Sequence, residues 1–119
     1  MSKYVDGFVL PVPKENVEAY RKMAELAGQV WREHGALEYV ECVADDVKPG
    51  KLTSFPQAVL AEPDETVVFA WIVYPSREER DRINAAVFAD PRLALDPSRP
   101  MPFDGKRMFF GGFTELVRA

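Results

Sequence analysis

Residues 66–74 read TVVFAWIVY, an unbroken run of apolar, aromatic and β-branched side chains that ends at Pro75. Such residues favour extended backbone, so the run predicts a buried strand. Successive side chains of a strand point to opposite faces. The two faces are formed by Val67, Phe69, Trp71 and Val73 on one side, and by Val68, Ala70, Ile72 and Tyr74 on the other. Neither face is polar, so this strand needs apolar cover on both sides.

Upstream of this strand the sequence predicts a strand, a helix and a second strand. Residues 4–10 are typical of a strand that Pro11 closes, and Pro13 can open a helix because the first helical turn needs no N–H at that position. Gly35 ends the helix. One helix face is formed, at 3-4-3-4-3 spacing, by Val17, Tyr20, Ala24, Ala27, Trp31 and His34. Residues 37–44 form the second strand.

Downstream, Ser76 and Glu79 match a capping box, so a second helix is expected before Pro91, with Ile83 and Val87 facing inward. A last strand is expected from Lys106. The order is βαββαβ. Two βαβ halves with right-handed crossovers give a four-stranded antiparallel sheet with both helices on one face, the ferredoxin-like α+β fold. A short helix capped by Ser54 is expected in the second connection.

Composition limits the class of protein. With 119 residues, 47% of them hydrophobic and 29% charged, the chain fits one globular domain over residues 1–119. The net charge of −4 and the scattered basic residues argue against binding nucleic acid. No apolar run is long enough for a signal peptide or a membrane span, so we expect a cytoplasmic protein that does not associate with membranes. The single cysteine, Cys42, excludes an internal disulfide and a CxxC motif.

The sheet face opposite the helices predicts an assembly. A sheet covered on one side should turn polar residues to water on the other, and this one does not. An exposed apolar patch of that size is unusual in a monomer, so we expect a homodimer in which two sheets pack against each other as a dimeric α+β barrel. The proline-rich arm, residues 91–105, carries Leu93, Leu95, Met101 and Phe103 and is long enough to reach the partner. Whether the arm is a lid or a dimer clasp stays open.

Several sequence strings resemble a known family. They run nearly end to end and comprise Asp6-Gly7-Phe8, Glu33-His34-Gly35-Ala36, Cys42 to Asp46, Ser54-Phe55-Pro56-Gln57-Ala58, Met101 to Arg107, and Gly111-Gly112-Phe113. Together they resemble the YbaA-like bacterial family, a domain of unknown function in the dimeric α+β barrel group. The resemblance implies the ferredoxin-like dimer and no activity, because none of the strings is a general catalytic signature.

His34 and the glutamates of the second strand are candidate site residues. His34 is the only histidine, and a pair with Glu38 or Glu41 could act as a general base. The alternative is a histidine favoured by the negative C-terminal end of its own helix. Glu38 and Glu41 lie on opposite strand faces, so one of them is a carboxylate in an apolar setting that needs a partner. We expect Arg107 or Lys106 to be that partner.

The start of the last strand has two interpretations. In the first, Asp104 and an inward Arg107 close one end of a pocket that is lined by Tyr39, Trp71 and Phe109. In the second, this segment only locks the dimer, and Phe109, Phe110 and Phe113 are core residues. For Cys42, a buried structural role is expected, because no activating neighbour is visible in the sequence.

Two hypotheses for function follow. The first is a homodimer that binds or converts a small hydrophobic or aromatic metabolite in a pocket between sheet and helices, without a cofactor or metal. Its candidate binding residues are His34, Glu41, Trp71, Asp104 and Arg107. The second is a non-enzymatic dimeric stress or scaffold module in which the same residues only pack. An enzyme and a binding protein remain alternatives.

Overall fold

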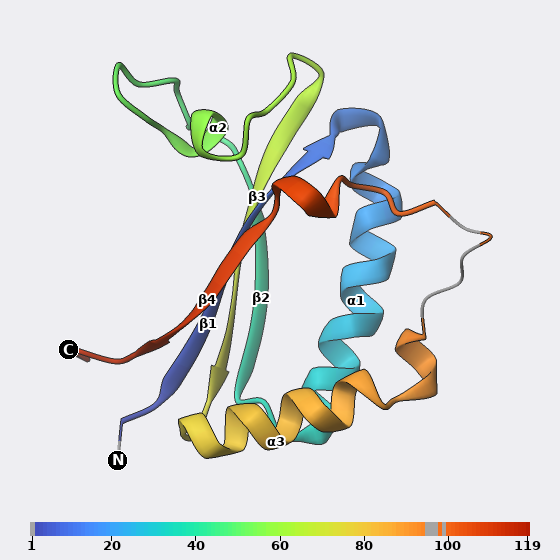
Figure 1. Ribbon diagram of the computed structural model, residues 1–119, viewed down its shortest axis with the longest axis vertical. Coiled ribbons are helices and arrows are strands. Elements are labelled where there is room, and N and C mark those ends of the chain that lie inside the picture. Colours follow the sequence, from blue (N-terminus) through green and yellow to red (C-terminus); the bar gives the residue numbers. More distant parts are fainter. Residues whose placement is uncertain (1, 95–97, 99) are drawn as a thin grey trace.

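The computed structural model describes residues 2–94, 98 and 100–119 (Figure 1). Its elements are β1 (Tyr4–Pro13), α1 (Val17–His34), β2 (Glu38–Val43), α2 (Phe55–Ala58), β3 (Glu65–Tyr74), α3 (Arg77–Phe88) and β4 (Phe109–Thr114). The four strands form one antiparallel sheet in the order β2-β3-β1-β4. The predicted βαββαβ order and the ferredoxin-like α+β fold are confirmed, and the doubly apolar β3 lies inside the sheet.

The strand β1 is longer than its sequence predicted. It runs through Pro11, which pairs with Val67, to Pro13, which pairs with Glu65. Its pairing with β4 ends at Val9, so beyond that residue β1 has β3 as its only neighbour. A proline that lacks an N–H is tolerated where the strand borders no second partner. The expected strand end before Pro11 is therefore wrong.

The strand β4 is shorter than predicted. It begins at Phe109, because Lys106 and Arg107 belong to a 3-10 turn, Gly105–Arg107. The Asp104 side chain accepts a hydrogen bond from the Lys106 N–H at 3.0 Å and caps that turn. The last strand therefore does not begin at Lys106, as the sequence predicted.

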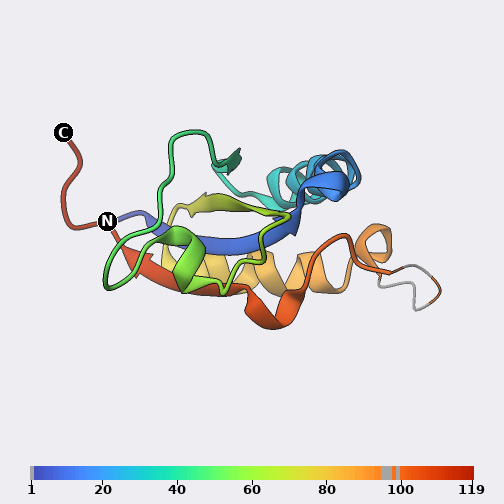
Figure 2. The same ribbon diagram turned by 90° about the horizontal axis from the view of Figure 1, so that it is seen from above.

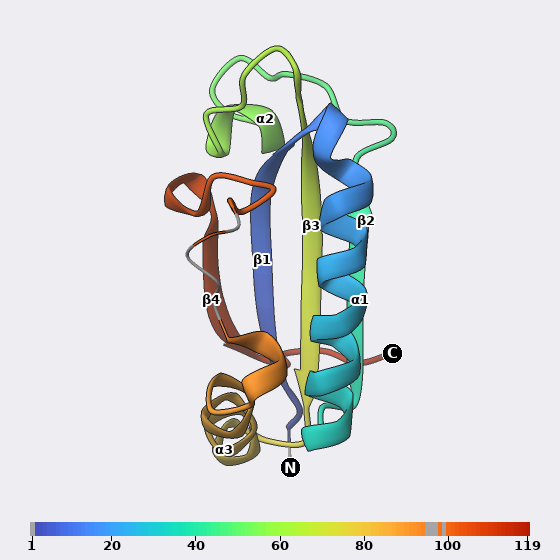
Figure 3. The same ribbon diagram turned by 90° about the vertical axis from the view of Figure 1, so that its right-hand side faces the viewer.

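Both helices lie on the same side of the sheet, but only α1 lies along it (Figures 1 and 2). In Figure 3, α1 lies in front of β2 and β3, whereas α3 is seen along its axis at the lower end of the sheet and points away from it. Residues 100–107, which lead into β4, lie over β1 and β4 at the other end of the sheet. The face toward α1 is therefore covered by a helix on one half and by an irregular segment on the other.

The helix α1 begins at Val17, after a 3-10 turn over Lys14–Asn16, so the expected opening at Pro13 is wrong. The other helix ends agree with the sequence. Ser76 Oγ accepts a hydrogen bond from the Glu79 N–H at 3.2 Å at the start of α3. Gly35 follows α1 with a φ of 120°, a backbone conformation that other residues rarely adopt. In the short helix α2, Ser54 Oγ accepts from the Gln57 N–H at 3.3 Å. These caps confirm all three predicted helices.

The core lies between the helices and β3. One cluster is formed by Val30, Ala36, Ile72, Tyr74, Ile83 and Val87. A second is formed by Leu10, Val12, Tyr20, Ala24 and Val68. Ile83 and Val87 are fully buried, as their spacing in α3 predicted. In the described part of the chain, no helix combines the length and the apolar character that crossing a membrane requires.

The opposite face of the sheet, here called the helix-free face, is covered only at one end. There Val59, beside α2, is buried against Val9 and Val67. The rest leaves aromatic side chains exposed, with Phe69 at 44%, Phe109 at 46% and Phe113 at 65%. Phe109 and Phe113 are therefore not core residues within one chain. Phe110, predicted as core, is also exposed; it faces the other way and stacks on Phe8 with ring centroids 5.8 Å apart.

The first prediction concerns the core. Ile83→Ala should lower the free energy of unfolding by about 2–5 kcal/mol, because it leaves a cavity between α3 and the sheet. Ala85→Ser, at an exposed position of the same helix, should change it by about 0.5 kcal/mol or less. Urea unfolding of both variants measures the difference. Equal losses would contradict the placement of α3.

Candidate functional site

A carboxylate with two phenol partners lies beneath α1. Glu41 pairs in register with Ala70 and so faces the helix. The hydroxyl of Tyr20, from α1, donates to Glu41 Oε1, and the hydroxyl of Tyr39 donates to Glu41 Oε2 at 2.5 Å. Tyr39 is two residues before Glu41 on β2, so both side chains share one strand face. Helix and strand thus converge on a single negative charge.

A glycine lets α1 approach this cluster. Gly28 is buried in the middle of the helix, and a Cβ at that position would lie 2.7 Å from Tyr39 Cδ1. Any larger residue would push the ring or the helix away. Trp31, one turn further along α1, packs on the same ring with centroids 5.9 Å apart. A glycine inside a helical pattern often marks a place where another group packs closely on the helix. Gly28 was therefore the one feature of the sequence that indicated this cluster.

Two cavities meet at the Glu41 cluster. The first, here called the inner cavity, measures about 180 Å³ and is lined by apolar side chains that include Phe8, Met23, Ala27, Trp31, Phe103 and Met108. The second, the outer groove, measures about 430 Å³ and includes Val17, Arg21, Gly28, Gln29, Arg32 and Val43. Tyr20, Ala24, Tyr39 and Glu41 line both. The polar cluster is therefore a wall shared by an apolar cavity and a more open, mixed groove.

The tyrosines of the cluster are held protonated. Burial raises the pKa of both Tyr20 and Tyr39, and the negative charge and hydrogen bonding of Glu41 raise it further. Both hydroxyls therefore remain donors to the carboxylate at neutral pH. Among the residues that the structure describes, no histidine, lysine or arginine forms an ion pair with Glu41, and no three potential metal ligands lie together.

His34 lies in a different cluster from the one expected. Its Nε2 is 2.9 Å from Asp90 Oδ2, at the end of α3, and not beside Glu38 or Glu41. Arg92 donates to the same Asp90 oxygen at 2.8 Å. Hydrogen bonds from Arg92 first, and from His34 second, lower the pKa of Asp90. Glu38 is exposed and the His34 side chain pairs with Asp90 instead, so the predicted His34–glutamate pair is wrong.

Asp104 and Arg107 also form a cluster of their own. Arg107 Nη1 and Nη2 donate to the two oxygens of Glu65 at 2.6 and 2.7 Å, and Arg107 Nε donates to Asp104 at 2.9 Å. The expected pairing of Arg107 or Lys106 with Glu41 is therefore wrong. Neither Asp104 nor Arg107 lines the two cavities. This cluster ties the start of β4 to the start of β3.

The predicted pocket of Tyr39, Trp71 and Phe109 exists only in part. Tyr39 and Trp71 both line the inner cavity, whereas Phe109 lines neither cavity. Trp71 pairs in register with Val40, so it shares the helix-free face, and its ring lies 5.6 Å from that of Phe69. Phe109 lies on that face as well, whereas Tyr39 points toward α1. Because side chains alternate along each strand, those of Trp71 and Phe109 point to the face opposite that of Tyr39.

Cys42 also differs from its expected buried, structural role. It is exposed on β2. It pairs with Phe69, on the helix-free face.

The described part of the arm folds onto its own chain. Phe103 packs edge-on against Tyr20 with centroids 5.6 Å apart, and Asn16 Nδ2 donates to the Pro102 carbonyl at 3.1 Å. Leu93 packs against the core. Of the other two apolar residues of the arm, Met101 is 48% exposed, and Leu95 lies outside the described residues. The expectation that the arm reaches a partner is thus wrong for Leu93 and Phe103, and Phe103 instead closes one side of the inner cavity.

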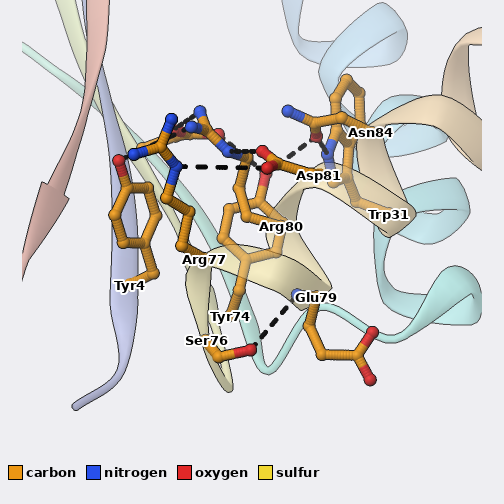
Figure 4. Close-up of polar contacts among 10 residues, drawn as sticks. Tyr4, Trp31, Tyr74, Ser76, Arg77, Glu79, Arg80, Asp81 and Asn84 are labelled. Atoms are coloured by element: carbon orange, nitrogen blue, oxygen red, sulfur yellow. Dashed lines mark hydrogen bonds and ion pairs between the residues drawn. The ribbon is translucent and has the colours of Figure 1, made fainter.

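A further polar network fastens α3 to the sheet. Arg80 Nη1 donates to the buried Asp6 at 2.9 Å, and the Tyr74 hydroxyl lies 3.1 Å from Asp6 Oδ2 and from Asn84 Oδ1. Trp31 Nε1 donates to the same Asn84 oxygen at 3.0 Å, and Figure 4 shows how these side chains converge from two helices and the sheet. Asp6 and Arg80 line neither cavity. Sequence reasoning missed this network, although a carboxylate inside an apolar strand was a signal for it.

The fold and this geometry define a ferredoxin-like α+β domain with a candidate ligand site between helix and sheet. Two solved structures share the fold: a dimeric ferredoxin-like protein from an uncultured marine organism, with a TM-score of 0.62 and 8% identity, and a NIPSNAP family protein of unknown function from Agrobacterium tumefaciens, with 0.59 and 12%. They cover 100% and 98% of this chain, and 100% and 91% of their own.

The chain belongs to the family described as protein of unknown function DUF1428, which matches residues 3–105. It is 52% identical over 115 residues to the uncharacterized protein YbaA of Escherichia coli K12, covering 97% of each chain. The same identity and coverage hold for YbaA of Shigella flexneri. The family resemblance seen in the sequence strings is thus confirmed.

The second prediction concerns the ion pairs of Arg107. Hydrogen bonds from Arg107 lower the pKa of Glu65 below its usual 4.5, so this carboxylate stabilises the fold above that pH and loses its effect as the pH falls through the folded-state pKa. Glu65→Gln should have a lower melting temperature than the wild type at neutral pH. The gap should close as the pH falls below 4.5 and Glu65 becomes protonated. Glu62→Gln, an exposed neighbour, is the control; a Glu65→Gln gap independent of pH would contradict this role.

Proposed function

We propose that this protein is a homodimeric α+β barrel protein that binds or converts a small hydrophobic or aromatic metabolite in the space between α1 and the sheet. The observation that carries the proposal is the Glu41 cluster in the wall between the inner cavity and the outer groove. An apolar cavity with a few convergent polar groups is the usual form of a small-molecule site.

The residues of the cluster suit binding better than packing. A carboxylate beneath a helix is costly unless it is paired, and apolar residues of similar size would fill the space more cheaply. Gly28 adds to this cost, since glycine inside a helix lowers stability by about 1 kcal/mol relative to alanine. These two destabilising features, at a site that is not filled by side chains, are explained if a ligand completes the site.

The homodimer has independent support. The helix-free face carries exposed aromatic side chains, and a stable interface buries about 1,600 Å² with an apolar centre. The solved structure from an uncultured marine organism that shares this fold is a dimeric ferredoxin-like protein, and we extend that assembly to this chain. In this arrangement the two sheets face each other and each α1, with its cavities, lies on the outside of the pair.

The same apolar face supports the second candidate, a dimeric module without a small-molecule ligand. Sheet pairing needs neither Glu41 nor the cavities, so the assembly and the ligand site can be tested separately. A dimer whose stability responds to no small molecule favours this candidate.

The third prediction tests the ligand site. In thermal-shift measurements with small aromatic and hydrophobic metabolites, at least one compound should raise the melting temperature, because a ligand of the folded state stabilises it. Ala27→Leu should abolish that shift by filling the inner cavity that Ala27 lines. Ala19→Leu, an exposed position of the same helix, should preserve it. A shift that survives Ala27→Leu would place the ligand elsewhere.

The fourth prediction tests the assembly. Light scattering should report a dimer for the wild type, and Trp71→Asp should abolish it, since a carboxylate at the centre of a paired apolar face is costly to desolvate. Leu52→Asp, at a position that is 98% exposed and outside the sheet, should remain dimeric. A folded Trp71→Asp dimer would show that the two copies do not meet through the helix-free face.

A further inference from the structure

The hydrogen-bonding capacity of the Glu41 cluster restricts what it can recognise. Each tyrosine hydroxyl has a single proton, and Tyr20 and Tyr39 both donate theirs to Glu41. An ionised carboxylate is an acceptor only, with about four lone-pair positions, of which the phenols use two. The cluster is therefore left with acceptor positions and no donor.

The cluster also carries an unbalanced charge. Within the described residues no cation forms an ion pair with Glu41, and its two partners are neutral phenols. In the outer groove Arg21 pairs with Glu18, and Arg32 donates to the Leu37 carbonyl. A positive ligand group is therefore favoured next to Glu41, and a negative one is repelled.

The inner cavity limits the size of the ligand. Its volume is about 180 Å³, and a dry apolar cavity of roughly 150 Å³ accommodates benzene. One six-membered ring with a short substituent fits. The rings of Phe8, Trp31 and Phe103 around the cavity suit an aromatic ring as well as an adjacent cation.

We propose that the site selects a one-ring molecule carrying a protonated primary amine on a short arm, with its ring in the inner cavity and its ammonium group on Glu41. This inference rests on the proposed function and names the ligand class for the same site. A hydroxyl in place of the amine binds more weakly, because it brings one donor and no charge. A carboxylate in that place is excluded.

Three matched probes test the proposal: benzylamine, benzyl alcohol and benzoate, titrated by calorimetry at neutral pH. We expect benzylamine to bind tightest, benzyl alcohol more weakly and benzoate not at all. Glu41→Gln should weaken benzylamine binding by about tenfold or more, the loss of one charged hydrogen bond. Glu78→Gln, which removes an exposed charge on α3 away from both cavities, should leave it unchanged.

Tyr39→Phe separates recognition from folding. It frees one acceptor position of Glu41 and should therefore bind benzylamine at least as tightly as the wild type. A purely structural cluster would lose affinity with both Tyr39→Phe and Glu41→Gln. If Glu41→Gln does not fold, the Tyr39→Phe affinity and the order of the three probes decide the question.

The outcomes distinguish the inference from the proposed function. Equal binding of benzoate and benzylamine, or a Glu41→Gln protein that binds benzylamine normally, overturns the ligand class. The ligand class is also overturned if none of the three probes binds while another metabolite gives a thermal shift that Ala27→Leu removes. In that case the proposed function stands. If no compound produces such a shift, both fail.

Discussion

The structure depends on burying both faces of β3. Its alternating side chains are apolar on each side, so a single layer of helices cannot satisfy it. On one side α1, with α3 at the end of the sheet, provides a conventional core. On the other side α2 covers only one end, and aromatic rings remain in solvent. One strand thus accounts for the fold and for the surface through which we propose a second copy binds.

The Glu41 cluster is the point where the core departs from simple packing. A glycine and a tyrosine of α1 face a tyrosine and a carboxylate of β2, and the helix closes over them without filling the space on either side. Burial keeps the phenols protonated, so they hold the carboxylate in place and leave its remaining lone pairs toward the cavities. Rigid donors of this kind fix the direction in which a ligand can approach.

The remaining charged clusters hold segments together. His34 and Arg92 fasten the residues after α3 to the end of α1, and Arg107 fastens the start of β4 to Glu65. Between these two fastenings Phe103 lies against Tyr20 and forms a side of the inner cavity.

The sequence alone determined the order of elements, the helix caps, the doubly apolar β3 and the family, because periodicity, capping residues and shared strings are local signals. It also showed that one of Glu38 and Glu41 must face the interior. Only the tertiary structure decided that it is Glu41, that Tyr20 and Tyr39 are its partners, and that His34 and Arg107 pair with Asp90 and Glu65. Most of these partners, such as Tyr20, Asp90 and Glu65, lie on elements distant in the chain, and α3 leaves the sheet at an angle that no local pattern encodes. For the same reason, only the structure showed that Phe109 is absent from the cavity that Tyr39 and Trp71 line.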